Sequence, residues 1–234
     1  MGEWVKATAR DGHNLSIYLA TPATPATPAT LATPGIVMLQ EIFGVTQELI
    51  DLTDRFAAEG YRVAVPALYD RIEAGKVLPY ADADSARTAK NQLRYDEIDA
   101  DIQAATQLVD EGSGLVLLGY CWGGGLAYWM AQNHRVDAVV SYYGTNIAQY
   151  CKSPATPSAR CQFHFGLDDP MIDAAARTVV KDSCRPTDQF FEYEGAGHAF
   201  ANVARPSFRE KATELAQRRT LDFLQQTFVD GAAG

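Results

Sequence analysis

The sequence of 234 residues lacks any run of about 18 apolar residues, and its first residues contain no apolar stretch typical of a secretory signal. We therefore expect neither a membrane span nor export, and a cytoplasmic location. Basic residues are also few, since 20 Lys and Arg stand against 29 Asp and Glu and give a formal net charge of -9. An acidic chain repels the phosphates of nucleic acids and anionic membrane surfaces, so we expect a small-molecule partner, with no nucleic acid and no membrane.

Cysteine is scarce, with four residues at positions 121, 151, 161 and 184. None of them forms a Cys-x-x-Cys pair or a Cys/His spacing suited to zinc, and a chain of this length does not need disulfides to fold. The sequence therefore predicts no metal site and no disulfide framework. We expect Cys151, Cys161 and Cys184 to be structural, with a resolving thiol in redox control as the alternative.

The organisation of the chain begins with a hairpin and a biased segment. Hydrophobic residues make up 47% of the sequence, enough for one core, so we expect a single domain over residues 1–234. Residues 5–9 and 15–19 flank Asp11-Gly12, a strong turn signal, and predict an antiparallel hairpin. Thr-Pro-Ala repeats fill much of residues 21–34 and predict an exposed polyproline-like loop. A tolerated surface insertion is the favoured role of this loop, and an interaction arm is the alternative.

From Gly35 onward, short apolar strands alternate with amphipathic helices. We expect strands at residues 36–39, 62–65, 115–118, 138–142, 161–165 and 189–193, and helices at about 46–59, at about 84–111, after residue 121 and through residues 215–228. This alternation predicts an α/β protein with a mainly parallel sheet covered by helices on both faces. Its active-site loops would follow the carboxyl ends of the strands.

The most informative segment is Gly-Tyr-Cys-Trp-Gly-Gly-Gly at residues 119–125, which lies between an apolar strand and an expected helix. In the Gly-x-Ser-x-Gly form of such a turn, the central residue is exposed on a sharp bend, and small neighbours such as Gly119 and Gly123 are a steric requirement. Cys121 is therefore the predicted nucleophile, although a free cysteine often only fills space in a core. Trp122 would offer its backbone N–H to a developing oxyanion.

An acid and a base follow the nucleophile in the chain order typical of α/β hydrolases. His198, after the last expected strand, is the predicted base, and a loop histidine with only local hydrogen bonds is the alternative. Asp169 is the favoured acid because Asp168 suits a turn, where Asx side chains commonly cap their own backbone. Glu192 and Glu194 are weaker candidates because they flank the strand that carries the base. The other histidines, at 13, 134 and 164, lack a nucleophile nearby in the pattern and are expected to be structural.

The loop after the strand at 36–39 carries a second group of candidates. This loop supplies the second oxyanion N–H in α/β hydrolases, and we assign that donor to Ile42. The apolar residues Ile42 and Phe43 favour burial of the neighbouring Glu41, where an unpaired charge would be costly. A surface glutamate is the alternative.

Five segments, at residues 40–44, 66–69, 119–124, 166–170 and 197–200, resemble the dienelactone hydrolase family (carboxymethylenebutenolidases) in content and order. The resemblance spans nearly the whole chain. It implies an α/β-hydrolase fold without a large cap, a Cys121–His198–Asp169 triad, and opening of an unsaturated lactone through a thioester intermediate. It also implies that Glu41 takes the thiol proton in concert with substrate binding. Every role is filled by the chain itself, so we expect no metal and no organic cofactor.

The substrate is less well defined by the resemblance. Family members that cleave dienelactone hold its carboxylate with arginines, and Arg71 matches one such position, whereas Asn202 occupies the other unless Arg205 reaches in. Phe43 and Tyr69 are the remaining expected substrate-binding residues. Asn202 favours, as the alternative, an activated ester or lactone without a carboxylate. A non-catalytic ligand-binding protein on the same scaffold is a further alternative, and we expect a monomer or a weak homo-oligomer.

Overall fold

The computed structural model describes residues 1–22 and 34–230. Most of the Thr-Pro-Ala segment lies outside the described residues, so its expected loop structure stays a prediction. The chain divides into two compact units, Met1–Leu115 and Val116–Gly234, and each is described by itself. The expectation of a single domain likewise stays a prediction. Among the described residues, no helix combines the length and the apolar character needed to cross a bilayer.

The first unit contains the predicted hairpin and two further strands. β1 (Glu3–Thr8) pairs antiparallel with β2 (Asn14–Ala20), as the Asp-Gly turn predicted. β2 pairs antiparallel with β4 (Arg62–Pro66), and β4 pairs parallel with β3 (Gly35–Leu39). Every residue of β3 is buried, as is all of β4 except its first residue. The continuous apolar runs of these strands follow from burial of both of their faces.

Helix α1 (Gln47–Ala58) agrees with the predicted helix at about 46–59. Its buried residues include Leu49, Leu52 and Phe56, which share one face at helical spacing. The helix packs against β4. It is followed by Gly60, whose φ of 99° is a left-handed conformation that glycine adopts without a steric penalty.

The single long helix expected at about 84–111 is wrong. The structure has two helices, α2 (Ala83–Gln92) and α3 (Tyr95–Val109), because the backbone is extended at Leu93 and Arg94, with ψ values of 138° and 148°. The N–H of Arg94 donates to the Glu97 carboxylate at 3.0 Å, which caps the start of α3. This local capping starts a second helix where the sequence analysis expected one continuous helix. The expected inner face of α3 is confirmed, and it buries Ile98, Ile102, Ala105 and Val109.

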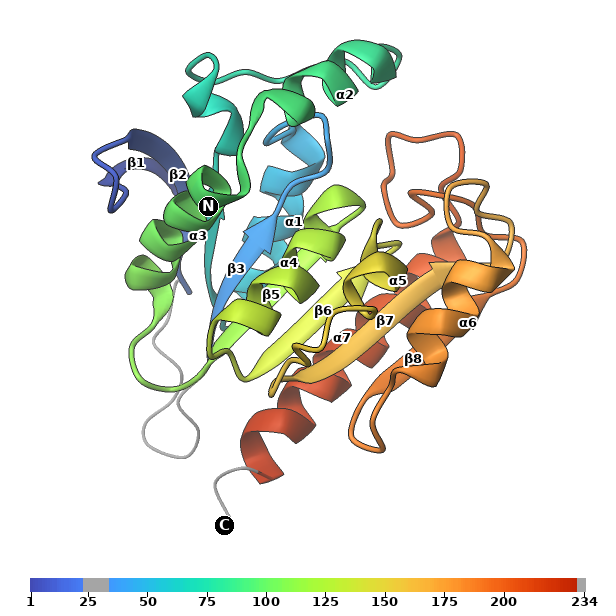
Figure 1. The fold of residues 1–234 in the computed structure, drawn as a ribbon. Coiled ribbons are helices and arrows are strands. Elements are labelled where there is room, and N and C mark those ends of the chain that lie inside the picture. The colour runs from blue at the N-terminus through green and yellow to red at the C-terminus, as the bar shows by residue number, and fades with distance from the viewer. Residues whose placement is uncertain (23–33, 231–234) are drawn as a thin grey trace. The chain divides into compact units, whose positions relative to one another are not determined.

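The second unit is built on parallel strands in the order β5-β6-β7-β8. Their bounds are Leu115–Tyr120 for β5, which starts at the unit boundary, Ala138–Tyr142 for β6, Arg160–Gly166 for β7 and Gln189–Tyr193 for β8. Helix α4 (Trp122–Asn133) covers one face of these strands and α7 (Glu210–Asp230) lies behind them (Figure 1). Two further helices, α5 (Ile147–Tyr150) and α6 (Ala174–Asp182), were not anticipated from the sequence.

A buried polar network joins β7 to α7 in the core of the second unit. The ring nitrogens of His164 lie 2.8 Å from the Tyr193 hydroxyl and 2.8 Å from the Gln162 side-chain oxygen. The hydroxyl of Thr220 donates to the same Gln162 oxygen at 3.0 Å. Burial lowers the pKa of His164 to about 3, so its ring is neutral at pH 7. This position in the core agrees with the structural role expected for His164.

Candidate active site

Cys121 stands on a sharp turn between β5 and α4. Its φ of 55° and ψ of -117° are rare for a residue with a side chain, a conformation that costs on the order of 1–3 kcal/mol. The turn is held by β6 and the loop that follows it, because the N–H of Cys121 donates to the Tyr142 carbonyl at 3.0 Å. The N–H of Thr145 donates to the Cys121 carbonyl at 3.0 Å. The surrounding structure therefore fixes the bend that the sequence predicted.

The glycine before the bend is a steric requirement, as expected. A Cβ on Gly119 would collide with the backbone carbonyl of Gly123 in the first turn of α4. On the helix side, a Cβ on Gly125 would collide with the carbonyl of Thr145. These close approaches let β5 turn directly into α4 without displacing the loop after β6.

Asp169 and His198 lie side by side. Asp169 follows β7, and one carboxylate oxygen is 2.8 Å from Nδ1 of His198, in the loop after β8. The other oxygen accepts the N–H of Met171 at 2.8 Å. Asp169 is 4% exposed, whereas the neighbouring Asp168 is exposed and donates its N–H to the Ala196 carbonyl at 3.0 Å. Of the two adjacent aspartates, it is therefore Asp169 that contacts the histidine.

The electrostatics of His198 link it to both of its predicted partners. Burial lowers the pKa of His198, but its hydrogen bond with Asp169, its interaction with the Cys121 thiol and the charges of both outweigh burial and raise the pKa to about 10. The imidazole is therefore protonated at neutral pH when both partners carry negative charge. Because β5, β7 and β8 are parallel, the residues that follow them meet at one edge of the sheet.

The weaker acid candidates lie elsewhere. Glu192 accepts the Nε–H of Arg177 at 3.0 Å, and Glu194 is exposed. His134 directly follows the last residue of α4, as predicted. The carboxylate that contacts His198 is that of Asp169, in keeping with the sequence analysis.

Backbone strain gathers around this cluster. Among the described residues, the non-glycine residues with positive φ are Cys121, Tyr143, Asn146 and Ala199. The ring of Tyr143 meets the ring of His198 edge-on with centroids 5.2 Å apart, and Ala199 directly follows His198. Strained residues concentrate at functional sites, so this pattern is an independent indication of one. The sequence analysis missed Tyr143, which has no turn signal of its own.

Trp122 is the first residue of α4 and is 4% exposed. The N–H groups of the first helical turn have no partner within the helix, and the helix dipole places partial positive charge there. This position suits the predicted role of the Trp122 N–H as an oxyanion donor. The role itself stays a prediction.

The loop after β3 in the first unit holds the other predicted oxyanion donor. Glu41 is 8% exposed and Phe43 is 4% exposed, so the expected burial of Glu41 is confirmed. The hydroxyl of Tyr69 donates to the Ile42 carbonyl at 2.6 Å, and the N–H of Leu78 donates to the Phe43 carbonyl at 2.9 Å. Tyr69 is itself only 1% exposed. Its hydroxyl supports this loop, and its expected substrate-binding role stays a prediction.

Arg71 is engaged by two carboxylates of the first unit. It follows Tyr69 in the short helix η1 (Leu68–Arg71), and its Nε and Nη2 lie 2.8 Å and 2.7 Å from the two oxygens of Asp101. Its Nη1 lies 2.8 Å from Asp11. Burial lowers the pKa of Arg71, but the hydrogen bonds and charges of Asp101 and Asp11 outweigh burial and raise it. Binding of a substrate carboxylate would require Arg71 to leave these pairs.

The position of Asp101 in the sequence could have indicated this ion pair. Asp101 lies on the inner face of α3 beside Ile98 and Ile102, and its side chain is fully buried. A carboxylate at such a position needs a cationic partner to offset the cost of burial.

Asn202 and Arg205 share one turn after His198. The side-chain oxygen of Asn202 accepts the N–H of Ala204 at 3.0 Å, and its backbone carbonyl accepts the N–H of Arg205 at 3.0 Å. Asn202 therefore shapes the turn with its own side chain. The substrate-binding role of Arg205 stays a prediction.

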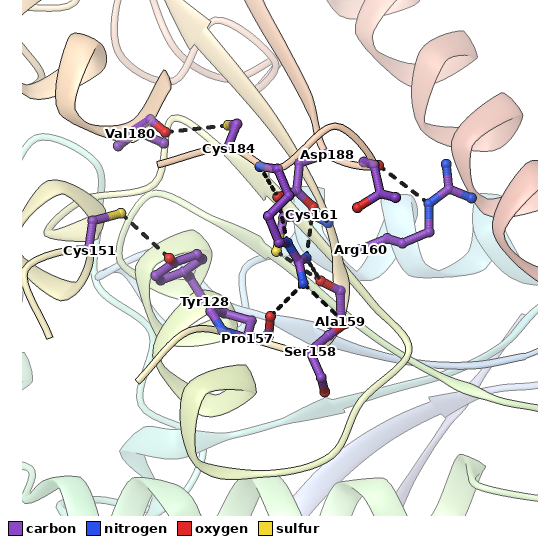
Figure 2. A network of polar contacts seen from close by, with 12 residues as sticks. Tyr128, Cys151, Pro157, Ser158, Ala159, Arg160, Cys161, Val180, Cys184 and Asp188 are labelled. Atoms are coloured by element: carbon purple, nitrogen blue, oxygen red, sulfur yellow. Dashed lines mark hydrogen bonds and ion pairs between the residues drawn. The ribbon is translucent and has the colours of Figure 1, made fainter. Parts of the chain in front are cut away.

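The other three cysteines belong to a separate network in the second unit (Figure 2). Sγ of Cys151 is 3.5 Å from the Tyr128 hydroxyl, and Sγ of Cys184 is 3.3 Å from the Val180 carbonyl. Burial raises the pKa of Cys161 and raises that of Cys184 to about 12. Both thiols are therefore protonated at neutral pH and poorly reactive, which supports the structural role expected for them.

Parallel strands, a strained turn carrying a thiol, and an aspartate and a histidine after two later strands define an α/β hydrolase. A model described as the dienelactone hydrolase family matches residues 16–228. The chain belongs to the dienelactone hydrolase family and is a hydrolase of that type.

The similarity extends over whole chains. A carboxymethylenebutenolidase of Pseudomonas putida is 30% identical over 231 residues, which cover 95% of each chain. The solved structure of a putative dienelactone hydrolase from Klebsiella pneumoniae matches with a TM-score of 0.69 at 25% identity and covers 96% of this chain and 99% of that one. A dienelactone hydrolase-like promiscuous phosphotriesterase from metagenomic libraries matches with a TM-score of 0.76 at 16% identity, covering 97% and 98% of the two chains. These likenesses confirm the predicted fold class.

Proposed function

We propose that the chain hydrolyses an activated ester or unsaturated lactone, with Cys121 as nucleophile, His198 as base and Asp169 as the group that orients the base. The observation that carries this proposal is the 2.8 Å contact between Asp169 and His198, together with the pKa of His198, which Asp169 and Cys121 raise to about 10. Of the described cysteines, it is Cys121 that stands on a strained strand-to-helix turn.

In the proposed reaction, Sγ of the Cys121 thiolate forms a bond to the ester carbonyl carbon. The backbone N–H of Trp122 and, following the family resemblance, that of Ile42 stabilise the resulting oxyanion. The carbon–oxygen bond of the ester then breaks, the alcohol oxygen leaves as an enolate, and a thioester remains. The released enolate takes the proton of His198, which leaves His198 neutral and able to act as a base. His198 next takes a proton from water as the water oxygen adds to the thioester, and the thiolate leaves as the carboxylic acid forms.

The charge state of the site supports a thiolate mechanism. A protonated His198 stabilises an adjacent thiolate, which is a stronger nucleophile than a thiol. An enolate is a stable leaving group, so little protonation of the departing oxygen is needed. Glu41 is the alternative acceptor of the thiol proton, and this role rests on the family resemblance.

A substrate without a carboxylate is the second candidate. The observation that favours it is Arg71, whose guanidinium already holds Asp101 and Asp11, together with an asparagine at position 202. Comparing carboxylated with neutral lactones separates the candidates. A dienelactone-type substrate gives the larger kcat/KM with the carboxylated compound, and the second candidate gives the larger kcat/KM with the neutral one.

The test of the nucleophile is turnover of dienelactone and of neutral lactones by Cys121→Ala. We expect hydrolysis to fall to background, because no other group replaces the thiolate. Cys161→Ala is the matched control and should retain turnover, since Cys161 is buried outside the cluster. Undiminished turnover in Cys121→Ala would defeat the proposal, whereas an absence of turnover in the unmodified protein would favour the non-catalytic alternative.

A further inference from the structure

A cavity of about 400 Å³ lies between α5 and α6 in the second unit. Cavities of roughly 300–1,000 Å³ are of the size that binds small molecules. The two helices pack against each other, and Phe165 of β7 lines the cavity together with residues of both helices. The side of α6 contributes Ile172, Ala175 and Val179, and the start of α5 contributes Ile147. Among the described residues, the lining includes no carboxylate. Asn146, Gln149 and Lys152 contribute polar groups, and the rest of the wall is mostly apolar.

Residues that line this cavity lie close in the chain to residues that hold the candidate active site in place. Gly144 and Asn146 line the cavity, and Thr145 between them donates its N–H to the Cys121 carbonyl at 3.0 Å. On the opposite wall, Met171 lines the cavity and donates its N–H to the Asp169 carboxylate at 2.8 Å. Both walls therefore begin at residues that hydrogen bond to members of the catalytic cluster.

Met171 is also 53% exposed although it is a large apolar residue. An unbranched methionine at the edge of an apolar cavity adapts its shape to chains of different length.

We propose that this cavity binds the aliphatic acyl chain of the ester substrate, which makes the protein selective for esters of medium-length aliphatic acids. The inference rests on the proposed function, because the chain must be attached to the carbonyl that Cys121 attacks. The physical basis is removal of methylene groups from water into an apolar cavity, which strengthens binding by roughly fourfold for each methylene buried.

The test measures kcat/KM for p-nitrophenyl acetate, butyrate, hexanoate and octanoate. In the unmodified protein, kcat/KM should rise from acetate to hexanoate. Ala175→Trp fills the cavity from α6 and should lower kcat/KM for hexanoate by about tenfold or more while that for acetate changes less than about twofold. Ala174→Trp is the matched control, because Ala174 is exposed on the same helix turn and does not line the cavity. It should leave the dependence on chain length unchanged.

The outcomes separate this inference from the proposed function. A flat dependence on chain length in the unmodified protein, or an equal loss for acetate and hexanoate in Ala175→Trp, would overturn the acyl-chain site. Hydrolysis of p-nitrophenyl acetate that survives in Cys121→Ala would instead overturn the proposed nucleophile. Selectivity that disappears in Ala175→Trp but persists in Ala174→Trp supports the acyl-chain site.

Discussion

At the scale of single residues, the candidate site depends on how neighbours set the charge of one imidazole. His198 is mostly buried, which alone would favour its neutral form, yet Asp169 and Cys121 raise its pKa to about 10. Asp169 can do so because its second oxygen is fixed by the N–H of Met171. The same principle works in reverse at His164, where burial without a carboxylate partner lowers the pKa to about 3.

The first prediction concerns Asp169→Asn. This change removes the charge that favours protonated His198, so the pKa of His198 should fall and kcat/KM should decrease. In the unmodified protein, the interaction of protonated His198 with Asp169 stabilises the folded state. Because the folded-state pKa of His198 is raised above the usual value of about 6.5, this contribution is fully present below about pH 6.5 and is lost as pH rises toward 10.

Unfolding measured against pH for both proteins checks this, together with NMR titration of His198. The stability difference between them should be largest at about pH 6 and should shrink by pH 10. A difference that grows with pH, or an unchanged His198 titration, would contradict the assignment.

The second prediction concerns Tyr69→Phe, which removes the hydroxyl that donates to the Ile42 carbonyl at 2.6 Å. The carbonyl loses a buried partner, so the free energy of unfolding should fall by about 1–2 kcal/mol. If Ile42 holds the oxyanion, kcat should also fall while KM changes little, because the loop is less well fixed.

Tyr80→Phe is the matched control for this change. The hydroxyl of Tyr80 donates to the side chains of Thr46 and Glu48. Its loss should affect stability without lowering kcat. An equal loss of kcat in both variants would argue against a positioning role for Tyr69.

At the scale of elements, the turn from β5 to α4 shows how close backbone packing restricts a position to glycine. The strand can bend into the helix only where Gly119 passes close to Gly123, and β6 must accept the N–H of Cys121 to hold the bend. Capping hydrogen bonds mark the first residues of two other helices. The bond from Arg94 to Glu97 starts α3, and the Asp173 carboxylate accepts the N–H of Ala176 at the start of α6.

The third prediction is that Gly119→Ala destabilises the protein by about 1–3 kcal/mol or prevents folding, because its Cβ would collide with backbone that cannot move aside. Gly197→Ala is the control. A Cβ at Gly197 would make only ordinary contacts, 3.6 Å from the Asp168 carbonyl oxygen and 3.7 Å from Ser207. Thermal unfolding of the two variants checks this, and similar melting temperatures would show that the approach at Gly119 relaxes easily.

At the scale of the whole molecule, three of the four cysteines divide into two kinds. Cys121 stands beside a protonated imidazole, whereas burial raises the pKa of Cys161 and Cys184 and keeps them as thiols. Thiolate, and not thiol, is the nucleophile, so the difference should appear in the reactivity of the intact protein.

The fourth prediction is that iodoacetamide at pH 7.5 labels Cys121 well before Cys161 and Cys184. Mass spectrometry of the digested protein after short labelling times measures this order. Cys121→Ala should lose the fast phase, and His198→Ala should slow it because the neighbouring positive charge is removed. Fast labelling of Cys161 or Cys184 would contradict the pKa directions that burial imposes.

Much of this fold follows from local sequence. The hairpin around Asp11-Gly12, the strands and helix α1 were predicted because turn chemistry and apolar periodicity are local properties. The thiol-bearing turn was predicted because its glycines and flanking strand are contiguous in the chain. The break at Leu93 and Arg94 was missed because no glycine or proline marks it and the cap is an arginine followed by a glutamate three residues later.

The sequence by itself determined the fold class and family and named Cys121, His198 and a choice of aspartates, since these depend on motifs and their order. Only the tertiary structure decided that Asp169 and not Asp168 contacts His198, that Arg71 is held by Asp101, and that a cavity lies between α5 and α6. The physical reason is that each of these depends on residues far apart in the chain, whose directions and distances exist only once the strands have paired and the helices have packed.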